Sequence, residues 1–191
     1  AAGATRIAQF STTWVVPEVP TDPVNRTFFL WNGADGGSLQ PVLQWGNGAT
    51  AYAIANWAYV GGYFHGTYLS VSPGDVLTGV VKFVEGSADK WTFKLSFEDH
   101  PEADLTVLRP NDVSSVCQCF EAYTPYPTQW PANQYTAMSK INLARRDGVF
   151  PPAKLDWWIS TTTTPPATQS GKTTVIVNES AIDGEIDFYF H

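Results

Sequence analysis

Residues 72–98 read SPGDVLTGVVKFVEGSADKWTFKLSFE, and this stretch decides the fold class of the chain. Ser72-Pro73-Gly74-Asp75 has the composition of a tight turn, and Glu85–Asp89 has that of a hairpin loop. Between these turns, Val76–Val84 places Val, Thr and Lys in alternation with Leu, Gly, Val and Phe. Side chains two residues apart share one face of a strand. The stretch therefore predicts a β-hairpin whose strands have two distinct faces.

The same pattern continues in both directions along the sequence. Short β-branched and aromatic runs alternate with turn residues about every 8–12 residues, as is typical of a β-sandwich or β-barrel. Helical periodicity is confined to Tyr135–Arg146, and Ser160–Gly171 has the polar composition of a linker. We predict one domain over residues 1–191. Its expected strands are Thr12–Val16, Thr27–Trp31, Val42–Trp45, Ala51–Tyr59, Tyr63–Val71, Val76–Val84, Trp91–Glu98, Thr106–Leu108, Val116–Tyr123, Lys154–Ser160, Thr173–Asn178 and Glu185–Phe190.

Composition and charge exclude several classes of protein. Of 191 residues, 43% are hydrophobic and 15% charged, so the chain can bury a large core and its composition argues against disorder. The net charge is −7, and no basic cluster is longer than Arg145-Arg146, which argues against nucleic-acid binding. No apolar run approaches the ~18 residues that span a bilayer, so we expect no membrane partner. The composition leaves the oligomeric state open.

The chain begins Ala-Ala-Gly-Ala-Thr, without an initiator Met. Either a leader has been removed or the chain was trimmed. The low content of Lys and Arg, with a pI near 4.8, fits a secreted, acid-tolerant protein and fits ordinary acidic proteins equally well. Secretion is the expectation that we carry forward.

The two cysteines form the sequence Cys117-Gln118-Cys119. On a strand they would face the same side, about 6.5–7 Å apart at Cα, near the upper limit for a disulfide. A strained bridge, two free thiols and pairing with another chain all remain open, and two small buried apolar residues are the plainest interpretation. No second Cys/His cluster exists to complete four metal ligands, so we expect neither a metal nor another cofactor.

An ordered set of motifs gives the sequence a resemblance to a known family, the glutamic peptidases or eqolisins, which are acid endopeptidases. Their pattern has a W-V-V-P-like strand, then W-x-G-x-D-G, L-Q-x-G, W-x-E-W, a P-G-D turn and a later strand with a catalytic Glu. The match extends over most of the chain and is most specific between residues 31 and 75. The matching stretches are Trp14–Pro17, Trp31–Gly36, Leu43–Gly46, Asn56-Trp57, Ser72–Asp75 and the strand around Glu121.

The resemblance implies a fold, an activity and a site. The fold is a two-sheet antiparallel β-sandwich, a concanavalin A-like jelly roll with a concave substrate groove, and the substrate is a polypeptide. By motif position, Gln44 and Glu121 form the catalytic dyad. A carboxylate can act as general base on water and then protonate the leaving amine, while a carboxamide N–H stabilises the oxyanion. The expected substrate-binding residues are Asp35, Trp31, Trp45, Asn56, Trp57 and Tyr59.

Two positions depart from the family pattern. Asn56 stands where the family has the glutamate of W-x-E-W, and the residues around Glu121 differ from the usual A-E-W-I. A register slip of one residue would turn Glu121 to the opposite face. Each candidate also has a plainer interpretation: Gln44 as an ordinary strand amide, Asp35 as a cap of its Gly-rich turn, and the tryptophans as core residues. A sandwich that binds a sugar or peptide without cleavage, or an enzyme of another class in the same groove, is the alternative function.

Overall fold

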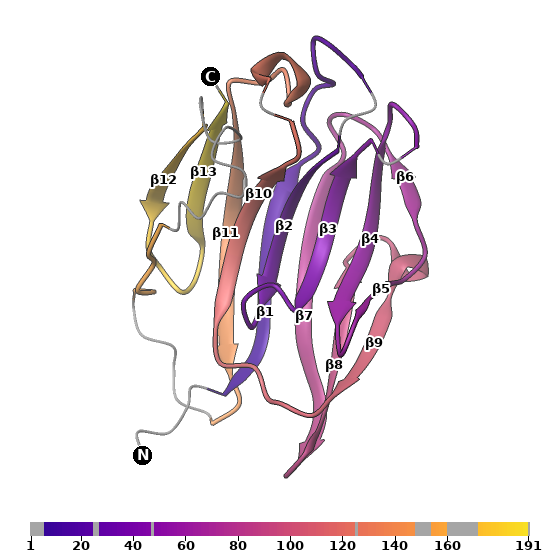
Figure 1. Cartoon of the computed structure of the whole chain (residues 1–191). Helices are drawn as coiled ribbons and strands as arrows, with labels where there is room; N and C mark the ends of the chain where they lie inside the picture. The colour runs from indigo at the N-terminus through magenta and orange to yellow at the C-terminus, as the bar shows by residue number, and fades with distance from the viewer. Residues whose placement is uncertain are drawn as a thin grey trace.

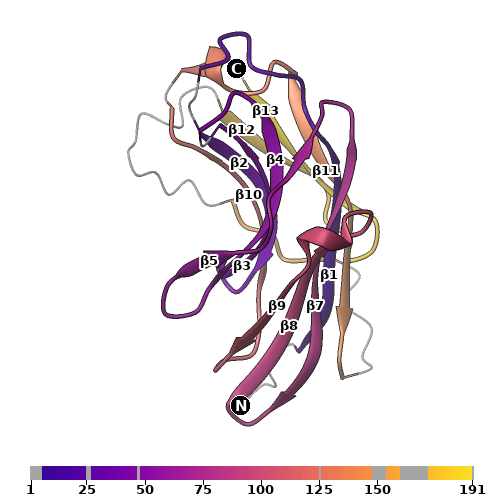
Figure 2. The ribbon, with the colours of Figure 1, turned by 90° about the vertical axis from the view of Figure 1, so that its right-hand side faces the viewer.

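The computed structural model describes residues 6–24, 27–46, 48–124, 126–147, 154–159 and 172–190. These residues form two antiparallel sheets that stack face to face (Figures 1 and 2). The predicted β-sandwich is confirmed, and the described residues contain two short 3-10 helices, η1 (Pro101–Ala103) and η2 (Pro127–Gln129), but no α-helix. The strands are β1 (Ile7–Val15), β2 (Phe28–Ala34), β3 (Leu39–Trp45), β4 (Tyr52–Tyr59), β5 (Tyr63–His65), β6 (Leu69–Val71), β7 (Val76–Ser87), β8 (Lys90–Phe97), β9 (Leu105–Arg109), β10 (Val116–Ala122), β11 (Tyr135–Arg145), β12 (Lys172–Asn178) and β13 (Gly184–Phe190).

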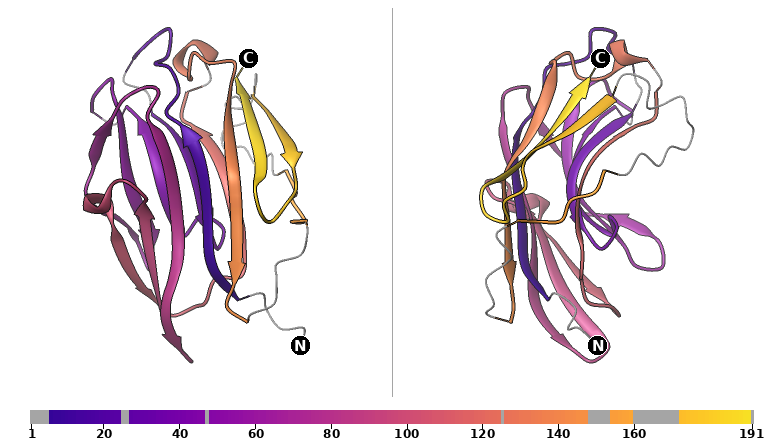
Figure 3. Two further views of the ribbon diagram at one scale, coloured as in Figure 1. Left: turned by 180° about the vertical axis from the view of Figure 1, so that it is seen from behind. Right: turned by 90° about the vertical axis from the view of Figure 1, so that its left-hand side faces the viewer.

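Each sheet forms one layer of the sandwich. The seven-stranded sheet runs β12-β13-β11-β1-β7-β8-β9. The six-stranded sheet runs β10-β2-β3-β4-β5, and β6 also pairs with β4. In side view the six-stranded sheet bends away from its partner at both ends, so its outward face is concave (Figure 2, and Figure 3, right).

The core lies between the sheets and is rich in aromatic residues. Trp14 of β1 packs edge-on against Phe97 of β8, with ring centroids 6.1 Å apart. Burying an aromatic side chain of this size contributes about 1.5–3 kcal/mol. The largest fully buried side chains are Trp14, Trp45, Trp130, Phe10, Phe28, Phe93, Phe97, Leu30, Leu39, Leu43, Ile54 and Leu77. This core fixes the inner face of the six-stranded sheet, so the side chains on its outer face stand on a packed base.

Two amide side chains join the two layers. Asn32 Nδ2 on β2 donates to the carbonyl of Gly79 on β7 at 3.0 Å, and Gln118 Nε2 on β10 donates to Thr12 Oγ1 on β1 at 2.6 Å. The first contact requires glycine, because a Cβ at Gly79 would lie 2.3 Å from Asn32 Oδ1. Hydrogen bonds between the sheets have a direction that apolar contacts lack, so they fix how one layer is placed over the other.

The helix predicted at Tyr135–Arg146 is wrong, because this segment forms β11, which pairs with β1 and β13. Both pairings shift register near Lys140, whose φ is +48°. A β-bulge inserts one extra residue and breaks the period of two. The buried residues of β11 are Thr136, Met138, Ile141 and Leu143, so a spacing of three interrupts the alternation and resembles the spacing of a helix.

Two predicted strands differ from the structure. Tyr63–Val71 divides into β5 and β6, which both pair with β4. Between them the backbone N–H of Gly66 donates to the carbonyl of Asn56 at 2.9 Å. Lys154 forms one isolated bridge with Ser180, and residues 155–159 form no strand. Ser160 and the predicted linker to Gly171 lie outside the described residues.

Candidate functional site

The structure places the two proposed catalytic residues in one row across the six-stranded sheet. Glu121 of β10 pairs with Phe29 of β2, and Phe29 pairs with Gln44 of β3. Residues directly opposite one another in an antiparallel sheet share a face. The neighbours Phe28 and Leu43 are fully buried on the inner face, so Glu121, Phe29 and Gln44 point outward. Two strand spacings put the Cα atoms of Glu121 and Gln44 about 9.6 Å apart, with Phe29 between them.

The Gln44 side chain is almost completely buried although it lies on the outer face. Its exposed fraction is 4%, and its Oε1 has no hydrogen-bond partner in the structure. On the side opposite Phe29, it pairs with Ala53 of β4, whose small side chain crowds it little. A buried amide oxygen without a partner costs about 1–3 kcal/mol, so this position is suited to a group that binds polar atoms of a ligand.

Two hydrogen-bond donors orient the Glu121 carboxylate. Trp31 Nε1 donates to Oε2 at 3.4 Å, and the Tyr123 hydroxyl donates to Oε1. Bonding to the Glu121 carboxylate, with a smaller contribution from burial, raises the pKa of Tyr123 to about 12. Tyr123 therefore remains a neutral donor through the whole acid and neutral range. The carboxylate is oriented by an indole and a phenol, which can donate to it but cannot neutralise its charge.

The position of Trp31 explains one glycine of the Trp31–Gly37 motif, Gly37, and contributes to the need for a second, Gly33. A Cβ at Gly37 would lie 2.8 Å from Trp31 Cη2, whereas one at Gly33 would lie 2.7 Å from the Leu39 carbonyl oxygen and 3.1 Å from Trp31 Cζ3. Gly37 also has a φ of +84°, which L side chains rarely adopt. The indole therefore lies flat along a backbone without side chains, with its N–H directed to Glu121.

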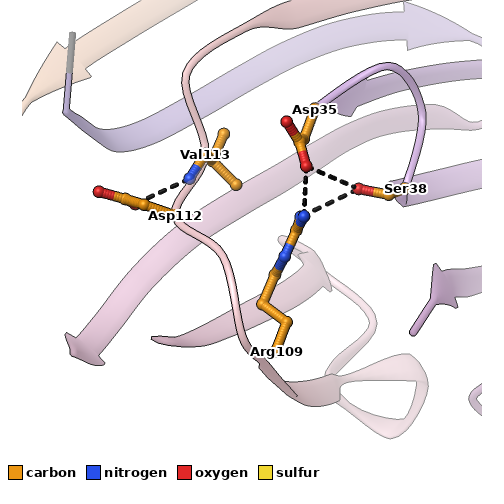
Figure 4. Close-up of polar contacts among 5 residues, drawn as sticks. All are labelled: Asp35, Ser38, Arg109, Asp112 and Val113. Carbon is orange, nitrogen blue, oxygen red and sulfur yellow. Dashed lines mark hydrogen bonds and ion pairs between the residues drawn. The ribbon is translucent and has the colours of Figure 1, made fainter. Parts of the chain in front are cut away.

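Asp35 lies at the end of this motif and is bound to the opposite sheet (Figure 4). The guanidinium of Arg109, the last residue of β9, forms an ion pair with Asp35 and donates to Ser38 Oγ at 2.9 Å. Ser38 Oγ in turn donates to Asp35 Oδ2 at 3.4 Å. Arg109 is 7% exposed and the Asp35 side chain 32% exposed. Asp35 thus fixes its turn, as its plainer interpretation has it, and it does so through a cation from the other layer.

Aromatic side chains continue the outer face beyond Gln44 toward β5. The ring centroids of Trp57 and His65 are 4.6 Å apart, as are those of His65 and Tyr68. Tyr59 and Tyr63 form a second pair at 4.9 Å, and both are largely exposed. Trp57 and Tyr59 are thus placed where an extended ligand on this face would reach them.

The other two substrate-binding candidates face the interior, which corrects their assignment. Trp45 is 2% exposed and stacks with Phe28 at 6.3 Å. Asn56 is fully buried, and its Nδ2 donates to the carbonyl of Ala103 at 2.7 Å. The reason is that adjacent residues of a strand face opposite sides of the sheet. Trp45 directly follows Gln44, and Asn56 directly precedes Trp57. Asn56, which departs from the family pattern, therefore occupies an inner position, and the departure removes no side chain from the outer face.

Three residues that contact or separate the candidate side chains were missed by sequence reasoning. Tyr123 lies two positions after Glu121, so the period of two could have placed both on one face. Phe29 lies two positions before Trp31 and could have been placed in the same way. Arg109 gave no local signal, because its partner Asp35 is distant in sequence and comes close only when the sheets stack.

Cys117 and Cys119 are both free thiols on the outer face, next to Trp31 and Glu121. Burial, partly offset by a hydrogen bond from the backbone of Gly37, raises the pKa of Cys117 to about 11. Burial, with the nearby Glu121 carboxylate, also raises the pKa of Cys119. Both thiols are therefore protonated at acid and neutral pH and are poor nucleophiles there.

The described ranges contain neither a metal-binding cluster of three or more side chains nor a membrane-spanning helix. No group of three or more His, Cys, Asp or Glu residues there could hold a metal ion. No helix in the same ranges is long and apolar enough to cross a membrane.

Comparison with solved structures places this fold among those of glutamic peptidases. The chain is similar to scytalido-glutamic peptidase bound to a peptide-based transition-state analogue, with a TM-score of 0.57 at 13% identity. It is equally similar to SCP-B, a member of the eqolisin family bound to the tripeptide Ala-Ile-His, with a TM-score of 0.57 at 12% identity. Each match covers 98% of this chain and 94% of the other. No family model matches the chain. No curated protein sequence matches it either, so the likeness is one of fold.

Proposed function

We propose that the protein is a secreted acid endopeptidase of the glutamic type, with Glu121 as general base and acid and Gln44 as oxyanion donor. One observation carries the proposal: Gln44 and Glu121 point outward from the same row of the concave sheet. The fold likeness to peptidases that bind peptide-based inhibitors supports it. Secretion is part of the proposal because acid digestion of proteins belongs outside the cytosol.

The reaction requires few groups. Glu121 takes a proton from a water molecule whose oxygen attacks the carbonyl carbon of the substrate. The Gln44 carboxamide donates an N–H to the oxyanion that forms. Glu121 then gives its proton to the amide nitrogen as the C–N bond breaks. With ~9.6 Å between the two Cα atoms, the water and the carbonyl lie above Phe29, between the two side chains.

The expected pH range follows from the chemistry of the base. Proton transfer is most efficient when the pKa of the base lies near the working pH. Glutamate side chains in model peptides titrate near 4.3. Trp31 and Tyr123 donate hydrogen bonds to the Glu121 carboxylate, and the Lys172 ammonium interacts with it electrostatically. We therefore expect cleavage at acid pH and little activity at neutral pH.

Digestion of an unfolded protein between pH 2 and 7 tests the proposal. We expect wild type to cleave, Glu121→Gln to lose activity by at least about 10³-fold, and Gln44→Ala by about 10²–10³-fold. Glu85→Gln, which changes an exposed carboxylate on β7, is the matched control and should cleave as wild type does. Cleavage that survives both substitutions would refute the dyad. Absence of cleavage by folded wild type at every pH would refute the peptidase.

The aromatic face of β4 and β5 favours one second function, which is binding without cleavage. Tyr59 and Tyr63 are exposed and could stack on sugar rings or peptide side chains. The two functions differ in their products. If immobilised glycans or peptides retain the chain and no peptide bond is cut between pH 2 and 7, the binding function is the correct one.

A further inference from the structure

The outer face of β10 carries a pair of thiols that the proposed reaction does not use. Cys117 and Cys119 are the two outward residues that precede Glu121, and both are free. Cys119 pairs with Trp31 and Cys117 pairs with Gly33 on β2. Gly33 has no side chain, so nothing from the neighbouring strand separates Cys117 from the indole that lies along Gly33 and Gly37.

The spacing of the pair disfavours a disulfide. Alternate residues of a strand are about 6.5–7 Å apart at Cα, whereas disulfides usually join Cα atoms 4.4–6.8 Å apart and need sulfurs about 2.05 Å apart. Forming that bond would require β10 to contract between two residues that are paired with β2. A metal ion that bridges two thiolates needs less contraction. Zinc–sulfur bonds are about 2.3 Å long, and two metal–sulfur bonds of similar length in a linear arrangement put the sulfurs roughly 4–5 Å apart.

The surroundings of the pair suit a soft ion with two ligands. Thiolates select soft metals such as Cu(I), and carboxylates select hard ones. The described residues hold no cluster of three or more metal ligands, so a tetrahedral zinc site is not formed there. The Gly37 backbone forms a hydrogen bond to the Cys117 sulfur. A donor of this kind also orients and stabilises a sulfur that is bound to metal.

We propose that Cys117 and Cys119 form a two-coordinate site for a soft, thiophilic metal ion, Cu(I) above all, on the strand that carries Glu121. On binding, each thiol gives its proton to solvent and each sulfur forms one bond to the ion, without a change in oxidation state. Glu121 is the next outward residue after Cys119. The bound ion therefore lies beside the carboxylate that the proposed peptidase uses and blocks access to it.

Metal transfer without any substrate tests the site independently of the proposed peptidase. Wild-type chain is titrated in oxygen-free buffer into the coloured complex of Cu(I) with a bicinchoninate chelator. We expect removal of one Cu(I) per chain. We expect Cys117→Ser and Cys119→Ser each to weaken binding by at least 100-fold, with unchanged far-ultraviolet circular dichroism and unchanged urea midpoints. The Glu121→Gln variant should bind as wild type does. Failure of wild type to compete, or full binding by either serine variant, would overturn the site.

Oxidation and inhibition provide two further outcomes. Wild type treated with oxidised glutathione should show no loss of 2 Da by mass spectrometry, because the geometry disfavours the intrachain disulfide. Its appearance would contradict the assignment. If the chain cleaves protein, Cu(I) should inhibit wild type and spare Cys117→Ser. Inhibition of both to the same degree would show that the ion acts elsewhere. A chain that binds Cu(I) and does not cleave would refute the peptidase and leave the metal site in place.

Discussion

At the scale of single residues, the N–H of Trp31 is the sharpest test of how Glu121 is oriented. Trp31→Phe keeps a ring over Gly33 and Gly37 and removes the donor to Glu121 Oε2. Hydrogen bonds to charged groups contribute about 1.5–3 kcal/mol, so we expect kcat/KM for a fluorogenic peptide to fall about 10–100-fold. The free energy of unfolding should change by less than about 1.5 kcal/mol. Trp91→Phe, in the other sheet, is the control, and an equal loss of activity there would contradict this role.

Substitutions at two adjacent glycines distinguish the cost of backbone strain from the cost of contact with the indole. Gly36 and Gly37 both have positive φ, but a Cβ at Gly36 would meet nothing within 4 Å, whereas one at Gly37 would lie 2.8 Å from the Trp31 ring. Gly36→Ala should cost about 1–2 kcal/mol in the free energy of unfolding and leave activity unchanged. Gly37→Ala should cost more and also lower kcat/KM, because it displaces Trp31. Urea unfolding and peptide cleavage measure both effects, and identical behaviour of the two variants would argue against the packing role of Gly37.

At the scale of elements, the bulge in β11 controls which face its side chains present. Lys140 has a φ of +48°, which glycine adopts without strain and a β-branched residue adopts only with strain. We expect Lys140→Gly to leave the free energy of unfolding within about 0.5 kcal/mol of wild type or to raise it. Lys140→Val should lower it by more than about 1 kcal/mol. Equal urea midpoints for the two variants would show that the bulge relaxes without cost.

The same bulge marks the limit of what sequence reasoning predicts for the elements. Most strands were predicted because hydrophobic residues alternate where a sheet has one buried face. The pattern of β11 predicts a helix because the extra residue changes the spacing between Met138 and Ile141 to three. The alternation of side chains along a strand also decides which candidate residues reach the outer face. Motif order predicts Gln44 and Glu121 as site residues. Trp45 is predicted beside Gln44 as well, although adjacent residues of a strand face opposite sides of the sheet. Which outward residues lie in one row depends on register, and one sequence alone does not give the register.

At the scale of the whole molecule, the Asp35–Arg109 pair connects the two sheets at the end where β2 turns into β3 (Figure 4). Its two ends differ in burial, because Arg109 is 7% exposed and Asp35 is 32% exposed. Removing one partner of a buried pair leaves the other charge uncompensated, and the cost rises with the burial of the charge that remains. The energetic consequence should therefore be unequal for the two partners.

We expect Asp35→Asn, which isolates the buried guanidinium, to lower the free energy of unfolding by about 3 kcal/mol. Arg109→Met isolates only a partly exposed carboxylate and should cost about 1–2 kcal/mol. The double variant should be more stable than the sum of the two losses predicts, because no unpaired charge remains in it. Urea unfolding of the four chains measures the coupling. Additive losses, or a larger loss for Arg109→Met, would mean that the two sheets are held together at this end by packing alone. In that case the position of the Trp31–Gly37 motif would not depend on a cation from the opposite layer.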